Sequence, residues 1–382
     1  MRPRSPALSL SLVAVVAAAA TAGARTGTPA PDVRRPTSDV VPLAAHGSRL
    51  AALPTDTLRI VHVGDINFAR GLARNVILPG RGAEVFAAVR DALRSADLAI
   101  GNLESVLVDR GDHADPPMTM VFAGPKQGAE LLRDAGFAAV ATANNHAWDF
   151  KRAGLVESLA HLDSAGVAHA GTGPTPDDAW RPAILRRKGW TVALFSLTAI
   201  FNDPSLSVVG RPAACCVAWA DTLRFRRAAR AARDSLGADV VLVSLHHGLE
   251  YRGLPTAADV ALARGLVRAG ADAVIGHHPH VPQAIEWVDG KPVLYSLGNF
   301  VFLQNSPWTR SGLWAELTFV PGEPVRLAVR PVEAGNAPRF QESIDSALTM
   351  IHVAGLSDSL RALPEPRAAR NVGSPTSRPR VP

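Results

Sequence analysis

Short apolar runs alternate with longer amphipathic segments through the middle of the chain. Runs rich in Val, Ile, Leu and Ala are typical of buried β-strands, whereas apolar residues spaced three or four apart predict helices. Strands are predicted at residues 58–63, 97–100, 138–141, 192–196, 240–245, 273–275 and 293–296. Helices are predicted at residues 82–95, 125–135, 152–165, 221–236 and 257–269.

The last two apolar runs, 312–320 and 325–332, flank Pro321-Gly322 and predict a β-hairpin. Strands and helices alternate before this hairpin, which indicates an α/β domain. Because a hairpin adds antiparallel strands to such units, the sequence favours mixed sheets, or two sheets packed together, over one purely parallel sheet.

Both ends of the chain differ in composition from its middle. Arg2 and Arg4 precede an apolar run at 7–20 and small residues at 22–24, which predicts a signal peptide over residues 1–24, cleaved near Ala24. The protein is therefore expected to be exported, to a periplasmic, extracellular or cell-surface location. An uncleaved membrane anchor is the alternative, although the apolar run is shorter than the ~20 residues that span a bilayer.

Three further segments complete the predicted organisation. Residues 25–55 are rich in Pro, Thr, Ala and Arg and are interpreted as a flexible linker. Residues 364–382 are rich in Pro and Arg and are interpreted as a disordered tail. Between them, a folded domain is predicted over 56–335, followed by a C-terminal helical segment over 336–363.

The basic character of the chain lies in its ends. The formal charge is +6 and the pI is about 10.0. The net charge is +4 over residues 1–55 and +3 over residues 364–382. Subtracting both from +6 leaves a net charge of −1 for residues 56–363. A nucleic-acid-binding core is therefore not expected. The two cysteines, Cys215 and Cys216, are adjacent and are interpreted as small buried apolar residues.

Polar residues cluster where the predicted strands end. Such positions are where α/β folds gather their ligands. Six of the 12 histidines fall in three of the clusters. In sequence order the clusters are GDIN (64–67), GNLE (101–104), ANNHAWD (143–149), HHGLEY (246–251), GHHPHVPQ (276–283) and YSLGNF (295–300).

These clusters combine imidazole, carboxylate and amide groups. Together they suit one or two divalent ions of Mn, Fe or Zn, and two such ions can share a bridging carboxylate. Any single Asp, Asn or His after a strand is more often a turn residue or a helix cap. The whole set, however, predicts a metal site.

Read in order, the six motifs resemble those of the CapA family of poly-gamma-glutamate capsule biosynthesis proteins. That family belongs to the calcineurin-like metallophosphoesterase superfamily, and the resemblance covers roughly residues 58 to 302. It implies a metallophosphoesterase-like fold, a layered α/β/β/α sandwich with mixed sheets.

The resemblance also implies roles for individual residues. His146 is expected to face the substrate as a catalytic residue, oriented by Asp149. Asn67 takes the place where many superfamily members carry a histidine, and Glu104 replaces the usual bridging aspartate. The implied metal ligands are Asp65, Asn67, Glu104, Asn145, His246, His278 and His280. Contacts with the substrate or with the ligands are expected from Asn102, His247, Glu250, Tyr251, His277, Gln283 and Asn299.

Two functions from different classes follow. The first is a metal-dependent hydrolase of a phosphoester, or of an amide such as poly-gamma-glutamate offers. The second is a non-catalytic factor that binds or anchors an anionic cell-surface polymer through its metal. The resemblance implies a step in capsule or polyglutamate synthesis, export or attachment, with the membrane capsule-synthesis machinery as a partner.

Overall fold

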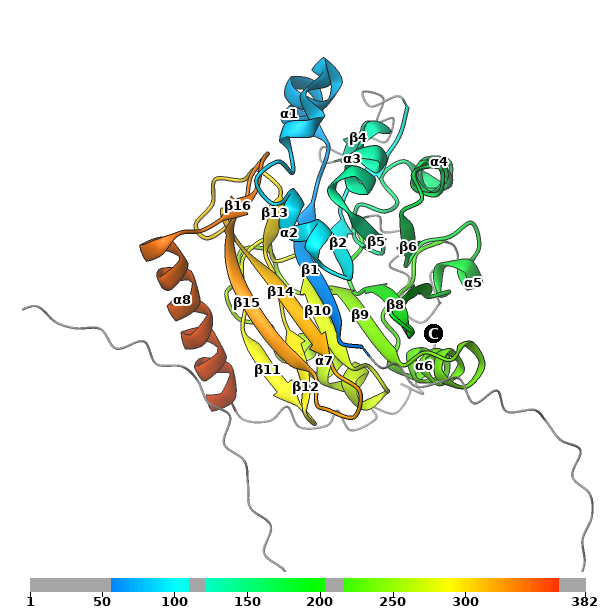
Figure 1. Ribbon diagram of the computed structural model, residues 1–382, viewed down its shortest axis with the longest axis vertical. Coiled ribbons are helices and arrows are strands. Elements are labelled where there is room, and N and C mark those ends of the chain that lie inside the picture. The colour runs from blue at the N-terminus through cyan, green and yellow to red at the C-terminus, as the bar shows by residue number, and fades with distance from the viewer. Residues whose placement is uncertain (1–55, 110–120, 203–215, 364–382) are drawn as a thin grey trace, which may run out of the picture. The chain divides into compact units, whose positions relative to one another are not determined.

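Two β-sheets stacked face to face form the centre of the fold (Figure 1). The computed structural model describes residues 56–109, 121–202 and 216–363. The first sheet has the order β16-β15-β14-β1-β2-β5-β6, and β13 also pairs with β1. Its strands are β1 (Leu58–Ile66), β2 (Leu98–Leu103), β5 (Phe137–Ala141), β6 (Ala168–Ala170), β13 (Asn299–Val301), β14 (Ser311–Phe319), β15 (Arg326–Glu333) and β16 (Arg339–Phe340).

The second sheet has the order β11-β12-β10-β9-β8-β7. Its four inner strands are parallel, and the two edge strands are antiparallel to their neighbours. Its strands are β7 (Ala183–Arg187), β8 (Trp190–Thr198), β9 (Val240–His246), β10 (Ala273–His277), β11 (Ile285–Val288) and β12 (Lys291–Leu294). In the first sheet β1, β2, β5 and β6 are parallel, while β14 to β16 are antiparallel, so both sheets are mixed.

Helices cover the outer face of each sheet. Apolar side chains of α2 (Arg90–Ser95), α3 (Gln127–Ala135) and α4 (Lys151–Ala165) pack on the first sheet. Those of α6 (Thr222–Leu236) and α7 (Ala257–Arg268) pack on the second. A third apolar core, which includes Ile60, Ile100 and Ile275, lies between the sheets. This arrangement confirms the predicted layered α/β/β/α fold with mixed sheets.

The sequence sets the ends of the long helices. The Asp221 side chain accepts hydrogen bonds from the backbone N–H groups of Leu223 and Arg224 at the start of α6. Gly237 ends that helix with a φ of 67°, a left-handed conformation that glycine adopts without a steric penalty. Helix α7 begins with a capping box formed by Thr256 and Asp259.

The remaining elements are short, except for the last helix. Helix α8 (Ser343–Ala362) packs against β11 and β15 along one flank of the molecule (Figure 1). Its side chains Val353 and Leu360 join the apolar cores. The other elements are α1 (Arg70–Leu72), the π-helix η1 (Ala73–Arg81), the 3₁₀-helix η2 (Gly82–Glu84), β3 (Val106–Leu107), β4 (Ala123–Gly124) and α5 (Pro176–Ala179).

One predicted helix is wrong in part. Residues 82–95 form η2, a series of turns and then α2, because Val89 has φ −121° and ψ −3°, outside the helical region. Val85, Phe86 and Val89 are nevertheless fully buried in the core of the first sheet. Their packing therefore decides the local backbone against the helical spacing of the sequence.

Cys216 is buried, and it is disulfide-bonded with a φ of 79°. The interpretation of a small buried residue is therefore confirmed for Cys216, which is oxidised rather than a free thiol. Cys215, the predicted signal peptide, the linker and the tail lie outside the described residues. Within the described part of the chain, no helix combines the length and apolar character needed to cross a bilayer.

Candidate metal centre

The carboxyl ends of parallel strands from both sheets supply the polar residues of the centre. Asp65 lies near the end of β1, and Glu104 follows β2 directly. In the second sheet, His246 ends β9 and is paired in register with His277 at the end of β10. Because parallel strands end at one edge of a sheet, and the two sheets are stacked, these residues meet although they are distant in sequence.

Two glycines allow the backbones near the ligands to approach closely. A Cβ atom at Gly64 would lie 2.0 Å from the carbonyl oxygen of Gly298. A Cβ atom at Gly276 would lie 1.9 Å from the carbonyl oxygen of Tyr295. Both distances are far below any real contact, so these positions require glycine for closeness of approach.

Glu104 is the most unusual residue of the centre. Its side chain is 0 % exposed, and neither carboxylate oxygen has a hydrogen-bond partner. Oε1 lies 3.6 Å from His246 Nε2 and 3.8 Å from His280 Nε2. An isolated buried carboxylate is strongly unfavourable unless a proton or a cation compensates its charge. The orphaned oxygens and the imidazoles around them therefore fit a divalent cation.

The ligand candidates divide into two groups that share Glu104. In each group, the potential ligand atoms all lie within 4.8 Å of one another. We call the group of Glu104, His246 and His278 the His246 position. Asn145 adds an amide oxygen to it, since Asn145 Oδ1 lies 2.8 Å from His246 Nε2. The other group, which we call the Asp65 position, consists of Asp65, Glu104 and His280.

Burial and neighbouring charges perturb these groups strongly. Burial raises the pKa of Glu104 well above its usual value, and the charges of Asp65 and Glu250 raise it further. Burial opposes ionisation of Asp65 as well, but contacts with His277 and His280 outweigh it and hold the pKa of Asp65 well below its usual range. Such perturbed groups are characteristic of functional sites.

Two of the histidines, His246 and His278, are held in their neutral form. Burial, followed by the nearby His278, lowers the pKa of His246 well below its usual value. Burial and the nearby His280 lower the pKa of His278 to about 3. Neutral imidazole is the form that binds metal ions.

Two asparagines fix the orientation of the ligand candidates. Asn102 Nδ2 donates to Asp65 Oδ1 at 2.8 Å and lies 3.3 Å from His246 Nδ1. His280 Nδ1 lies 2.9 Å from Asn299 Oδ1, which suits a donated hydrogen bond and leaves the lone pair on Nε2, the nitrogen that faces Glu104. Such outer contacts set the tautomer and direction of metal-binding histidines.

His146 and Asp149 form a buried pair beside the ligands. His146 Nδ1 lies 2.8 Å from Asp149 Oδ2, an oxygen that also accepts a hydrogen bond of 2.7 Å from the backbone N–H of Phe122. The ring of Phe122 stacks on His146 with the ring centroids 3.8 Å apart. On the other nitrogen, Nε2 lies 3.5 Å from Asn202 Nδ2. The imidazole is therefore held with Nδ1 toward Asp149 and Nε2 toward Asn202.

The predicted ligand Asn67 and the predicted neighbours His247 and Gln283 contact other parts of the protein. Asn67 Oδ1 accepts a hydrogen bond of 2.8 Å from the backbone N–H of Ala69. His247 Nδ1 turns to Asp259 on α7, at 3.2 Å. Gln283 Nε2 donates to the backbone carbonyl of Arg252 at 2.7 Å, while its Oε1 is buried without a partner.

The other predicted neighbours lie around the centre. His277 Nδ1 lies 3.2 Å from Asp65 Oδ1. Glu250 and Tyr251 are exposed, and the Tyr251 hydroxyl accepts a hydrogen bond of 3.2 Å from Gln304 Nε2. Glu250 forms a further group of possible ligands with His278 and His280.

Sequence reasoning missed Asn202 and Phe122 at the centre. Asn202 Oδ1 accepts a hydrogen bond of 3.1 Å from Asn145 Nδ2, so it orients the amide of a ligand candidate. Neither residue belongs to a polar cluster at the end of a predicted strand. A lone asparagine and a lone phenylalanine gave no signal that could have singled them out.

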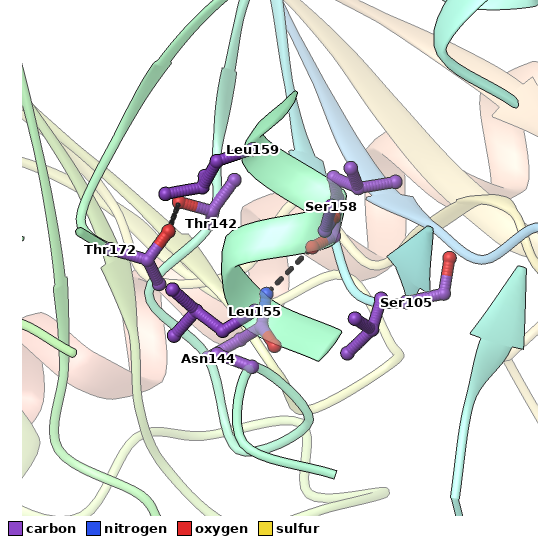
Figure 2. Close-up of a pocket in the computed structure, with 10 residues that line it drawn as sticks. Ser105, Thr142, Asn144, Leu155, Ser158, Leu159 and Thr172 are labelled. Atoms are coloured by element: carbon purple, nitrogen blue, oxygen red, sulfur yellow. Dashed lines mark hydrogen bonds between the residues drawn. The ribbon is translucent and has the colours of Figure 1, made fainter. Parts of the chain in front are cut away.

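An interior cavity lies behind the loop that carries Asn145 and His146. It has a volume of about 20 Å³, and Figure 2 shows Asn144, Thr142 and Thr172 around it. The two threonine hydroxyls are hydrogen-bonded at 2.7 Å. A space of this size holds about one water molecule. It is therefore a packing feature of this loop and too small for a substrate.

Comparison with known proteins shows the family of this chain. The family described as "Bacterial capsule synthesis protein PGA_cap" matches residues 59–304, which contain every ligand candidate. The chain belongs to this family. The PGA_cap family is part of the metallophosphoesterase-like superfamily, in agreement with the resemblance of the motifs.

The chain is similar to two capsule proteins of Bacillus species. It is 29 % identical over 294 residues to the "PGA biosynthesis protein CapA" of Bacillus subtilis, covering 76 % of each chain. It is 29 % identical over 312 residues to the "Capsule biosynthesis protein CapA" of Bacillus anthracis, covering 81 % of this chain and 70 % of that one. Among solved structures, TT1561 of Thermus thermophilus is similar with a TM-score of 0.39 and 10 % identity, over 72 % of this chain and 99 % of that one.

Proposed function

We propose that this PGA_cap protein is an exported, divalent-metal-dependent hydrolase that acts in the synthesis, export or attachment of a capsule or poly-gamma-glutamate polymer. The observation that carries the proposal is Glu104, a fully buried carboxylate without a hydrogen-bond partner, shared by two groups of ligand candidates. Membership of the family and the names of the two Bacillus relatives support the capsule part of the proposal.

The donor set suits Mn, Fe or Zn. Imidazole, carboxylate and amide oxygen meet at the His246 position, and these are ligands that such ions share. When bound, a divalent cation polarises the scissile group and lowers the pKa of a water molecule. The protein residues that would hold it are Asp65, Glu104, Asn145, His246, His278 and His280.

The contacts of His146 support a role for this side chain in proton transfer. Asp149 accepts from Nδ1, so the imidazole presents Nε2 to the leaving group. Asp149 is itself held by the backbone N–H of Phe122, which prevents the pair from rotating. Both side chains are at most 5 % exposed, so bulk water does not compete for the proton.

A specific observation favours the alternative, a non-catalytic binding factor. Asn67, which stands in place of the usual histidine, uses its side-chain oxygen to accept from Ala69 N–H. The Asp65 position therefore has fewer protein ligands than the His246 position. A single tightly held cation would bind the carboxylates of an anionic polymer without hydrolysing them.

Turnover of a generic phosphodiester with added Mn²⁺ separates the two functions. The hydrolase is expected to show Mn²⁺-dependent turnover, together with bound metal in elemental analysis of the purified protein. Glu104→Gln should abolish both, because the shared carboxylate loses its charge. Tight binding of poly-gamma-glutamate without cleavage of either substrate would establish the binding factor instead.

A further inference from the structure

A third group of potential ligands lies on the solvent side of the centre. It consists of Glu250, His278 and His280, whose ligand atoms lie within 4.8 Å of one another. Glu250 follows β9 by four residues and is exposed, whereas both histidines are buried. The Glu250 carboxylate therefore approaches the centre from the solvent side. It differs in this from Glu104, which is buried.

The histidines of this group have unused ligand atoms. His278 is 5 % exposed, and its Nδ1 is buried without a hydrogen-bond partner. His280 Nδ1 lies against Asn299 Oδ1, which leaves Nε2 available. A buried imidazole nitrogen without a partner requires an explanation, and coordination of a cation would supply the partner.

Carboxylates approach the centre from two sides. Asp65 and Glu104 are buried in it, while Glu250 lies beside His278 and His280 at its exposed edge. Carboxylates gathered in one site require a counter-charge, which bound cations supply.

Glu250 is grouped with one histidine from each of the two positions. His278 belongs to the His246 position and His280 to the Asp65 position, and the ligand atoms of all three residues lie within 4.8 Å of one another. The Glu250 carboxylate can therefore reach a cation that these two histidines hold.

We propose that Glu250 is a metal ligand, and that with His278 and His280 it holds a cation on the solvent side of the centre. This inference rests on the proposed metal centre and assigns to Glu250 a role in it. The outer position offers one carboxylate and two imidazoles, donors that Mn, Fe and Zn ions share.

Exposure of Glu250 determines how tightly this second cation is held. An exposed carboxylate on a short loop keeps its rotamer freedom and is in competition with water, so its bond to the cation exchanges readily. The outer position at Glu250 therefore binds its cation more weakly than the buried positions do. Its cation is also the one that an anionic group of a substrate meets first.

Titration of metal-free protein with Mn²⁺, followed by the electron paramagnetic resonance signal of free Mn²⁺, tests this ligand. The unaltered chain should bind two equivalents, one tight and one weak. Glu250→Gln should weaken the second equivalent by at least about tenfold and leave the first unchanged. Glu250→Asp, which keeps the carboxylate, should retain part of the affinity. Glu84→Gln, at an exposed residue paired with Arg81, is the matched control and should change neither.

The outcomes separate this inference from the proposed function. Identical Mn²⁺ binding in Glu250→Gln and in the unaltered protein would overturn the role of Glu250 and leave the metal centre standing. An equal loss of both equivalents would also overturn it, because Glu250 would then act on the whole centre. Absence of any Mn²⁺ binding by the unaltered chain would instead overturn the proposed function. Circular dichroism of each variant checks that the fold is intact.

Discussion

Asn145 and His146 are neighbours in sequence, yet they face different parts of the centre. Asn145 Oδ1 lies against His246 among the ligand candidates. His146 turns to Asp149 and stacks on Phe122. One loop therefore supplies both a ligand candidate and a proton-transfer candidate. The two roles can be separated because each residue can be substituted without touching the other.

Substitution of these two residues should give opposite patterns. His146→Ala is expected to leave the metal content intact and to lower kcat by ~10²- to 10⁴-fold with little change in KM, because only proton transfer is lost. Asn145→Ala should lower the metal content, with activity partly recovered at high Mn²⁺. Steady-state kinetics and elemental analysis measure both effects. An empty metal site in His146→Ala would mean that His146 is a ligand or a structural residue.

At the scale of single elements, strand β10 shows how closely the backbones are packed around the centre. Gly276 lies one residue before the end of β10, and the carbonyl group of Tyr295 occupies the space that a side chain would need. Helix α8, in contrast, contains a glycine with open space around it. Gly355 is exposed, and a Cβ atom there would meet nothing within 4 Å.

Alanine at these two positions should change stability in opposite directions. Gly276→Ala is expected to lower the free energy of unfolding by about 3 kcal/mol or more, because two backbone segments must separate. Gly355→Ala should raise it by about 0.5–1 kcal/mol, since alanine is the better helix former. Urea unfolding of both variants measures the changes. Equal stability of Gly276→Ala and the unaltered protein would show that β10 and the Tyr295 segment move apart freely.

The long elements and the polar ends of the strands could be predicted from the sequence, while short elements and single contacts could not. An apolar run such as β9 is long enough to show its pattern, and the cluster after it is visible as a change to polar residues. Strand β13 has three residues, which is too short for any periodicity. Asn202 acts through one side chain, and its pairing with Asn145 depends on tertiary contacts that no local pattern encodes.

At the scale of the whole molecule, histidines buried between and beside the sheets link stability to pH. His62 on β1 is fully buried, and its Nδ1 lies 3.1 Å from the carbonyl oxygen of Val63. Burial, followed by the nearby His277, lowers the pKa of His62 to about 3. The unfolded chain takes up a proton at this residue below pH ~6.5, whereas the folded chain does not. Acid therefore favours unfolding through His62.

The pH dependence of unfolding should reveal this residue. The contribution of His62 is complete above pH ~6.5 and is lost as the pH falls toward 3, at up to about 1.4 kcal/mol per pH unit. His62→Leu cannot take up a proton, so its free energy of unfolding should fall less steeply between pH 6 and 4 by about that amount. Urea unfolding of metal-free protein at several pH values gives both slopes. Parallel pH profiles would show that His62 is protonated equally in both states.

The ligand candidates are divided between the two sheets, from Asp65 on β1 to His280 after β10. A chain synthesised from its N-terminus holds the first of them long before the last exists. Contacts between residues so distant in sequence form late, because the chain must first close a long loop. The metal would then bind late in folding, and only to molecules in which the two sheets have packed together correctly. A truncated or misassembled chain would carry no metal, so metal content would measure the fraction of correctly assembled protein in any preparation.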